Sequence, residues 1–267
     1  MLQFISMGSG SSGNCYCLLT EDNGLMIDAG LGIRNMKKSF VSFGLPISRI
    51  HHILITHDHA DHVKSVGRLS NNFGLPVYAT EKVHAGIDGN YCVHQKIEAE
   101  QRRYIEVGNT FSLGDFEITP FHVPHDSNDN VGYKIVYEDV CLVLMTDVGH
   151  VTDEMKQMIS SANYLVIEAN HDKNMLVSGP YPQHLKVRIA GPNGHLANSD
   201  CAIALAENAT VKLKHVWLCH LSEENNHPEL AFKTVEETLL SHSIELGKDF
   251  DLTVLKRKSP SELYQLG

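Results

Sequence analysis

The stretch Ile53-Leu-Ile-Thr-His57-Asp58-His59-Ala60-Asp61-His62 decides how this sequence is understood. A short apolar run, expected to be a buried strand, leads directly into a dense group of metal-ligand side chains. His57 and His59 are two residues apart, so an extended backbone points both imidazoles in the same direction. Asp61 and His62 then offer a second pair towards a neighbouring position. Imidazoles with a carboxylate suit zinc, manganese, iron, cobalt or nickel better than calcium or magnesium, so the segment predicts a transition-metal site.

Other apolar runs along the chain end on the same kinds of side chain. The residues that follow these runs are Asp28, His125, Asp147, Glu168 and His220. Sites in α/β folds gather beyond the carboxyl ends of strands, so we expect these side chains to meet in one polar site. Apolar runs and helix-period segments alternate throughout, which predicts a layered α/β domain with helices on the outside.

Helical segments can be placed between the runs. Apolar residues at helical spacing between Val63 and Phe73, with Gly74 after them, predict one helix directly behind the metal motif. Thr152 is a good N-cap for a helix that contains Met155. Pro228 predicts the start of the last helix.

The composition fits a metal-binding globular protein. The chain has 267 residues, a formal net charge of −10 and 42% hydrophobic residues, and no apolar run is long enough to span a membrane. This excludes collagen, coiled coils and wholesale disorder. Histidine is abundant, at 17 residues, which points to metal chemistry before any motif is considered.

The N-terminal segment and the cysteines predict a cytoplasmic location. Met1-Leu-Gln-Phe-Ile-Ser has neither a basic region nor a long apolar region, so no secretory signal is expected. The six cysteines include no C-x-x-C pair and no zinc-knuckle spacing. Scattered cysteines of this kind are typical of a reduced protein.

The H-x-H-x-D-H segment at residues 57–62 resembles the signature of the metallo-β-lactamase superfamily, and the resemblance covers essentially the whole chain. It implies an αββα four-layer sandwich and a single catalytic domain over residues 1–267. The stretch between Asp147 and His220 is too short for the β-CASP domain that larger RNA-processing relatives carry there. The implied cofactor is a pair of divalent ions, Zn, Mn or Fe.

The resemblance also implies a ligand set. By correspondence with the superfamily motifs, one metal is held by His57, His59 and His125, and the second by Asp61, His62 and His220. Asp147 bridges the two ions. Asp28 matches the aspartate of the first motif, and we expect it to orient the ligands without binding metal itself.

Two further resemblances narrow the activity. Glu168 and His195 resemble the Glu and His that assist the leaving group in tRNA-processing zinc phosphodiesterases. The segments 8–14, 168–172 and 194–198 resemble the YycJ/WalJ group of small bacterial metallo-β-lactamase-fold proteins. That group is implied to consist of DNA exonucleases that run from 5′ to 3′, so DNA ends or single strands are the expected substrate.

The expected reaction is phosphodiester hydrolysis by a metal-bridging hydroxide. The two ions neutralise the non-bridging phosphate oxygens, and Asp61 accepts the proton of the hydroxide. His195 donates a proton to the departing sugar oxygen, and Glu168 holds His195 in the required tautomer. For His195 the alternative is a residue next to a helix start, and for Glu168 it is a salt-bridged strand end.

Substrate contacts are predicted at two places. The loop Gly8–Asn14 is either a hairpin turn or a nest of backbone N–H groups for a terminal phosphate, with Ser11, Ser12 and Asn14 as the contacts. Asn170 and Arg188 are the other candidates. A net charge of −10 opposes binding to DNA over a broad surface. We therefore expect DNA binding to depend on local basic patches around Lys64, Lys186 and Lys256.

Three alternatives remain open. The first is a small-molecule phosphodiesterase or thioesterase, which a closed apolar pocket would favour, whereas an open groove with flanking Arg and Lys would favour nucleic acid. The second is RNA as the substrate, because nothing in the sequence reads a 2′-hydroxyl. The third is a metal-dependent binding protein without turnover. The oligomeric state is not predicted.

Overall fold

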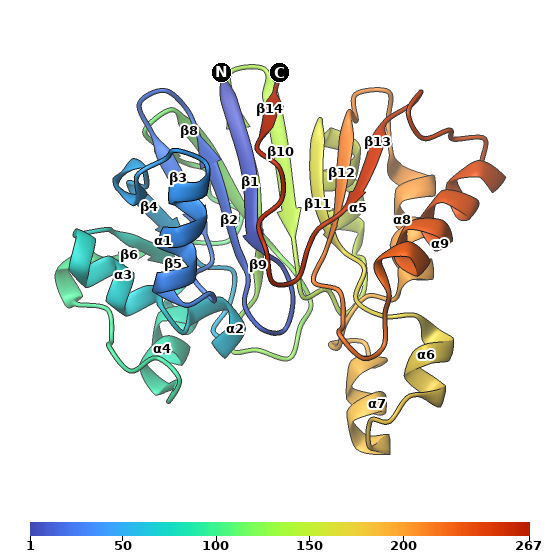
Figure 1. The fold of residues 1–267 in the computed structure, drawn as a ribbon, viewed down its shortest axis with the longest axis horizontal. Helices are drawn as coiled ribbons and strands as arrows, with labels where there is room; N and C mark the ends of the chain where they lie inside the picture. Colours follow the sequence, from blue (N-terminus) through green and yellow to red (C-terminus); the bar gives the residue numbers. More distant parts are fainter.

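Two sheets of seven strands each pack face to face, with helices on their outer surfaces (Figure 1). The structure is a computed structural model that describes all of residues 1–267. The strands of the first sheet are β1 (Leu2–Gly8), β2 (Cys15–Leu19), β3 (Gly24–Ile27), β4 (His52–Leu54), β5 (Val77–Ala79), β6 (Arg102–Tyr104) and β14 (Tyr264–Leu266). Those of the second sheet are β7 (Phe111–Leu113), β8 (Phe116–His122), β9 (Val131–Tyr137), β10 (Val140–Met145), β11 (Tyr164–Glu168), β12 (His215–Cys219) and β13 (Asp251–Val254).

The helices divide between the two outer faces. The first sheet carries α1 (Ile33–Ser42), α2 (Ala60–Val63), α3 (Val66–Phe73) and α4 (Glu81–Gly89). The second half of the chain supplies α5 (Asp153–Ser161), α6 (Lys173–Ser178), α7 (Gln183–Ile189), α8 (Asn198–Asn208) and α9 (Pro228–Ser241). Each half of the chain therefore builds one sheet and its helices, except that β14 returns to the edge of the first sheet beside β1.

Both sheets have a parallel portion whose strands end at the same edge. The first sheet runs β14-β1-β2-β3-β4-β5-β6, with β3 to β6 parallel. The second runs β13-β12-β11-β10-β9-β8-β7, with β10 to β13 parallel. Because β9 is antiparallel to both β8 and β10, the strand β8 points in the same direction as β10. The carboxyl ends that carry the candidate ligands are thereby gathered together.

Three buried apolar layers lie between the four layers of secondary structure. Along the inner strands, alternate residues such as Phe4 and Leu18 face the other sheet, where they meet Trp217. Their neighbours Ile5 and Cys17 face the helices instead. A separate cluster lies between the second sheet and α5, α8 and α9. Since both faces of each sheet are covered at its centre, central strands such as β2, β3 and β11 are buried along their whole length. The predicted αββα sandwich is confirmed.

The helix predicted from Val63 to Phe73 is wrong in one respect, because the chain forms two helices, α2 and α3. The backbone N–H of Asn14 donates to the carbonyl of Asp61 at 2.8 Å, and Ser65 N–H donates to Ala29 O. Tertiary hydrogen bonds thus replace the helical ones at this point. The interruption fixes Asp61 and His62 against the neighbouring loops.

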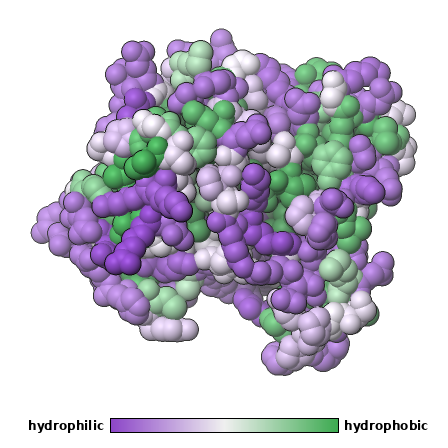
Figure 2. Space-filling model, viewed as in Figure 1, coloured by the Kyte–Doolittle hydropathy of each residue, from purple (hydrophilic) through white to green (hydrophobic).

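Other helix ends follow the sequence. Thr152 caps α5 by accepting a hydrogen bond from Met155 N, and Pro228 opens α9. No helix of the structure has the length and apolar character needed to cross a membrane. The face shown in Figure 2 is mixed, with hydrophobic residues in scattered patches among hydrophilic ones.

Candidate metal centre

The predicted ligands from both sheets converge at the shared edge. Ligand atoms of His57, His59 and His125 lie within 4.8 Å of one another. Those of Asp61, His62 and His220 form a second group within the same limit. The residues come from segments that follow β4, β8 and β12, so the sandwich brings together side chains far apart in the sequence.

Asp147 lies between the two groups. Its Oδ2 is 3.1 Å from His62 Nε2, while its Oδ1 is 3.7 Å from His125 Nε2 and 3.6 Å from His220 Nε2. The carboxylate is buried, at 1% exposed. A single side chain therefore faces both groups, which is the arrangement that a bridging ligand requires.

Hydrogen bonds on the far side of four of the imidazoles leave the other nitrogen of each ring directed into the site. The nitrogen Nδ1 of each ring is held by an oxygen atom: Thr56 Oγ1 for His57 at 3.0 Å, Asp28 Oδ2 for His62 at 2.7 Å, Gly194 O for His125 at 2.9 Å and Glu168 Oε1 for His220 at 2.9 Å. Partners of this kind fix the tautomer and orientation of metal-binding histidines.

The free nitrogens fit a divalent cation. His57 Nε2 is buried and has no hydrogen-bond partner. His125 Nε2 and His59 Nδ1 approach to 3.3 Å. Imidazole nitrogens that converge with carboxylates at these separations are the donor set of zinc, manganese or iron. The chain therefore carries a divalent-metal site.

The electrostatic potential around His62 is strongly negative, because several carboxylates surround it. Although burial opposes protonation, the carboxylates of Asp147 and Asp28 raise the pKa of His62 to about 10. By contrast, burial and the neighbouring histidines hold the pKa of His57 well below its usual range. A field that binds protons so firmly also attracts a metal cation, and the two compete for the same nitrogens.

Asp28 lies behind the cluster and contacts His62. It is fully buried, and besides His62 it accepts hydrogen bonds from Thr56 N at 2.9 Å and Thr56 Oγ1 at 2.9 Å. Thr56 could not be identified from the sequence. A threonine at the end of a strand is common, and only the folded contacts show that its hydroxyl joins Asp28 to His57.

Glu168 contacts two histidines. Its Oε1 accepts a hydrogen bond from His195 Nδ1 at 2.9 Å and another from His220 Nδ1 at 2.9 Å. Its Oε2 accepts from the backbone N–H groups of Val148 and Leu196. Burial alone would raise the pKa of Glu168, but His195 and His220 lower it to about 2. The contact with His195 matches the sequence prediction, whereas the contact with His220 was not anticipated.

His195 lies in the loop that precedes α8, not on the helix itself. Its ring stacks on that of His220 with centroids 5.4 Å apart. Burial opposes its charge, but Glu168 raises the pKa of His195 above its ordinary value. An imidazole that is protonated near neutral pH can act as a general acid.

The loop Gly8–Asn14 is a tightly bonded turn. The N–H groups of Ser9, Gly10, Gly13 and Asn14 all donate to acceptors within the protein. Ser11 lines the cavity beside the cluster, and Ser12 is exposed with its carbonyl accepting from Lys64 Nζ. Asn14 is buried and donates to Gly10 O. The turn therefore anchors the metal motif. For the alternative of an anion-binding nest, only the backbone amides of Ser11 and Ser12 remain available to a phosphate.

Asn170 and Arg188 both line the same cavity, which measures about 230 Å³. Asn170 Nδ2 donates to His220 O at 2.9 Å. Arg188 forms an ion pair with Asp126, and its side chain is 52% exposed. Tyr181 and His195 complete this part of the wall.

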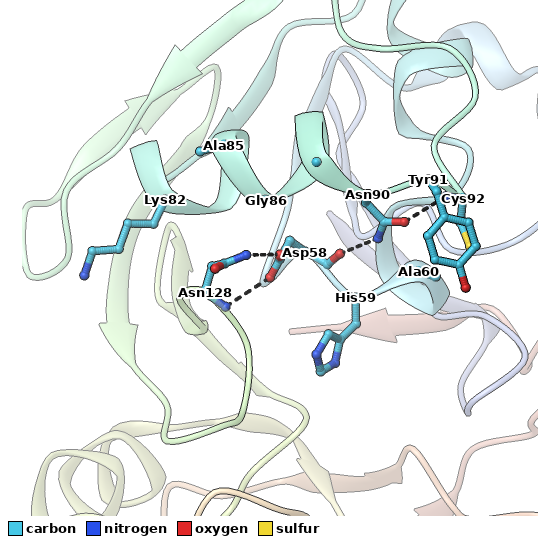
Figure 3. Close-up of a pocket in the computed structure, with 11 residues that line it drawn as sticks. Asp58, His59, Ala60, Lys82, Ala85, Gly86, Asn90, Tyr91, Cys92 and Asn128 are labelled. Atoms are coloured by element: carbon cyan, nitrogen blue, oxygen red, sulfur yellow. Dashed lines mark hydrogen bonds between the residues drawn. The ribbon is translucent and has the colours of Figure 1, made fainter.

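A larger cavity of about 690 Å³ lies on the other side of His59, which lines both. It is bounded by α4, by the loop that follows α4 and by Asn128 (Figure 3). Apart from Asp58, His59 and Ala60 of the metal motif, its lining residues belong to no recognisable motif, so nothing in the sequence marks them as a cavity.

In the expected basic patch around Lys256, two charged side chains have partners within the protein. Arg257 donates to the carbonyls of Leu221, Ser222 and Asn226, so it holds a loop in place. Lys258 pairs with Glu223. Arg257 is thus a structural residue, whereas Lys258 stays at the surface in an exposed ion pair.

Backbone strain accompanies the cluster. Asp28, Asp147 and His220 have φ values of 62°, 54° and 53°, in the left-handed region that non-glycine residues rarely adopt. Each residue stands just beyond the end of a strand. Strain of this kind, of order 1–3 kcal/mol per residue, persists only where the surrounding structure holds it, and it is concentrated at functional sites.

Comparison with known proteins identifies relatives over the full length. Residues 23–220 match the family model of the Beta-lactamase superfamily domain. The chain is 37% identical over 265 residues to "Exodeoxyribonuclease YycJ" of Bacillus anthracis, covering 98% of both chains. It is 36% identical over 244 residues to "Exodeoxyribonuclease WalJ" of Streptococcus pneumoniae, covering 91% of this chain and 90% of that one. The fold resembles that of Zn²⁺-bound PqqB from Methylobacterium extorquens, with a TM-score of 0.72, 18% identity and coverage of 97% and 99%.

Proposed function

This chain belongs to the metallo-β-lactamase superfamily and, within it, to the family of YycJ and WalJ, and on that premise we propose that it is a metal-dependent exodeoxyribonuclease. The observation that carries the proposal is the near full-length similarity to two exodeoxyribonucleases in a chain whose histidines and aspartates converge at one edge. The proposed direction of digestion is 5′ to 3′.

Two divalent ions are proposed as cofactors. His57, His59 and His125 would hold one ion, and the second would be held by Asp61, His62 and His220. Asp147 would bridge them. The four imidazoles held from behind and the unpartnered His57 Nε2 support this assignment. Zn, Mn and Fe all suit the donor set.

The bound ions would supply an activated water nucleophile and neutralise charge on the phosphate oxygens. The side chains of the protein do the rest. Asp61 is partly exposed in the smaller cavity, and its carboxylate takes the proton of the attacking water. His195, with Nδ1 donating to Glu168, presents Nε2 to the sugar oxygen and gives it a proton as the bond to phosphorus breaks.

Glu168 serves this reaction as a positioning residue. It is ionised at any working pH, because its pKa is about 2. Its charge favours the protonated form of His195, and its geometry holds the ring in one orientation. The same carboxylate holds His220, so the leaving-group acid and a metal ligand are aligned by one side chain.

Ser11, Asn170 and Arg188 are proposed to contact the terminal nucleotide from the walls of the smaller cavity. Ser12 and Asn14 would act through the loop that carries Ser11, since Asn14 is buried. Arg188 supplies positive charge for a phosphate, although Asp126 offsets part of it.

The shape and lining favour a polymer over a small apolar substrate. The two cavities adjoin at His59, and polar side chains including Asn128, Lys82 and Arg188 line them. A thioesterase or a phosphodiesterase for small molecules would need a more enclosed, apolar pocket. We propose that the whole of residues 1–267 forms one catalytic domain. Its six cysteines are free, which suits the cytoplasm.

Digestion of labelled nucleic acids tests the proposal. Single- and double-stranded DNA and RNA of one sequence, each labelled at either end, are incubated with the chain and Mn²⁺ or Zn²⁺. The expected result is release of single nucleotides from the 5′ end of DNA, with RNA digested more slowly. Products released from internal positions, or RNA digested faster than DNA, would contradict it.

A further inference from the structure

We propose that the larger cavity, under α4, binds the part of the DNA strand that remains after the terminal nucleotide is removed, with Tyr91 stacking on a base and Lys82 contacting a phosphate. This inference rests on the proposed function and names the second half of its substrate site. The cavity is lined by Asp58, His59, Ala60, Lys82, Ala85, Gly86, Gly89, Asn90, Tyr91, Cys92 and Asn128.

The position of His195 assigns the two cavities to the two sides of the broken bond. In 5′ to 3′ digestion, water forms a bond to phosphorus and the bond from phosphorus to O3′ of the terminal nucleotide breaks. His195 gives its proton to that O3′, so the terminal nucleotide lies on the side of His195, in the smaller cavity. The strand with the new 5′-phosphate must leave on another side. His59 lines both cavities, so the larger one begins where the phosphate is cleaved.

Tyr91 has the properties of a stacking platform. Its side chain is 88% exposed although it is large and apolar. The backbone around it is nevertheless rigid, because Asn90 Nδ2 donates to Asp58 O at 2.8 Å and Cys92 N donates to Asn90 Oδ1 at 2.9 Å. Lys96 Nζ also donates to Asn90 O. An exposed ring on a fixed backbone lets any base stack on it without reading the sequence.

Lys82 supplies a positive charge that nothing else neutralises. It is exposed and takes part in no ion pair or hydrogen bond, unlike Arg188 or Lys258. The nearest acidic residue in the cavity, Asp58, is bound by the backbone and side-chain amides of Asn128. In Figure 3, Lys82 and Tyr91 stand at opposite ends of α4, with His59 between them.

The floor of the cavity is closely packed, with Gly86 of α4 against Asp58. A Cβ atom on Gly86 would lie 2.1 Å from the carboxylate of Asp58, so a side chain there would displace Asp58 and with it Asn128. Residues 83–89 of α4 lie between Lys82 and Tyr91, so about 10 Å of helix separates the two positions. That spacing suits a strand lying along the helix, with a phosphate at one end and a base at the other.

A scan with abasic DNA tests the inference on the metal-loaded chain. Single-stranded oligonucleotides carry one abasic site, moved stepwise away from the first phosphodiester bond, and kcat/KM is measured for release of the first nucleotide. With the wild type, we expect a loss of roughly 5- to 100-fold at one position, where the base on Tyr91 is missing. Tyr91→Ala should lose a similar factor on intact DNA and should lose nothing further at that position.

The controls separate stacking from other effects. Tyr91→Phe keeps the ring and should behave like the wild type. Tyr104→Ala removes another exposed tyrosine, 63% exposed and outside the cavity, and should also behave like the wild type. Lys82→Ala should reduce the slope of log kcat/KM against log salt by about one, whereas Lys233→Ala, on α9, should not.

Two results would overturn the inference. One is wild-type kcat/KM of Tyr91→Ala on intact DNA. The other is an abasic penalty that is the same in Tyr91→Ala as in the wild type. Failure of the wild type to digest intact DNA at all would instead refute the proposed function, and with it this inference.

Discussion

Glu168 shows how one buried side chain can align two parts of a site. Both its oxygens are saturated, with His195 and His220 on one and two backbone amides on the other. The other ring nitrogen of each histidine is directed into the cavity, where His220 Nε2 lies 3.2 Å from Asp61 Oδ2. At the scale of the residue, the chemistry therefore depends on hydrogen bonds behind the reactive atoms as much as on those atoms themselves.

His195→Ala tests the assignment of the leaving-group acid. We expect it to keep its metal content and to lose 10²- to 10⁴-fold in kcat on DNA, because general acid catalysis contributes that much. The measurement is single-turnover digestion together with metal analysis of the purified variant. His242→Ala, at the exposed end of α9, is the control. Turnover within a few-fold of the wild type would remove His195 from the mechanism.

His171 should give the stability a dependence on pH. Burial lowers its pKa to about 4, against about 6.5 in the unfolded chain. Below pH 6.5 the unfolded state therefore binds more protons, and stability falls as the pH drops towards 4. Between pH 7 and pH 4.5 this residue alone should cost about 2 kcal/mol.

Urea unfolding of the metal-free chain at those two pH values checks the sign and size. The wild type should lose about 2 kcal/mol more than His171→Gln, whose side chain does not titrate. Chelator is present throughout, so metal release does not contribute to the difference. An equal loss in both proteins would show that His171 is not buried in its neutral form.

At the scale of the element, the loop after β3 is packed against the metal motif. A Cβ atom on Gly30 would lie 1.5 Å from the carbonyl oxygen of Asp61, so only glycine permits this approach. The same loop donates from Ala29 N to His62 O. The interruption between α2 and α3 and the position of two ligands thus depend on a backbone contact between distant segments.

Gly30→Ala is expected to displace Asp61 and to reduce both metal content and activity, the latter by about 10²-fold, since a misplacement of about 1 Å costs that much. Gly32→Ala is the matched control, because a Cβ atom there meets nothing within 4 Å. Circular dichroism should show the fold intact in both variants. Full activity in Gly30→Ala would mean that the motif does not need this contact.

The ligand cluster could be predicted from the sequence, but the contacts between loops that support it could not. The spacing of His57, His59, Asp61 and His62 and the polar ends of the strands indicated the ligand cluster, because local spacing and strand direction determine them. The roles of Thr56 and Gly30 could not be predicted, since they depend on contacts between loops. The cavity under α4 was missed for the same reason, because Tyr91 and Lys82 belong to no motif.

At the scale of the whole molecule, the metal site joins the two halves of the sandwich. His57 and His62 follow the first sheet, whereas His125, Asp147 and His220 follow strands of the second. A bound metal therefore links both sheets, and its binding free energy adds to the stability of the fold.

Chelation should lower the melting temperature. At a free metal concentration of about 1,000 times Kd, the contribution is about 4 kcal/mol, which corresponds to a shift of roughly 8–16 °C for a chain of this size. Calorimetry of the chelated and reloaded protein measures it. Zn²⁺ or Mn²⁺ should restore the value better than Mg²⁺. An unchanged melting temperature would argue against a site shared by the two sheets.

The most direct test of the account is a metal titration of the chelated chain against 5′-labelled single-stranded DNA. We predict no release of nucleotide without metal, full activity at about two equivalents of Mn²⁺ or Zn²⁺, and single nucleotides as the first labelled products. Digestion that persists without metal, saturates at one equivalent, or yields labelled fragments longer than one nucleotide would contradict a two-metal exodeoxyribonuclease.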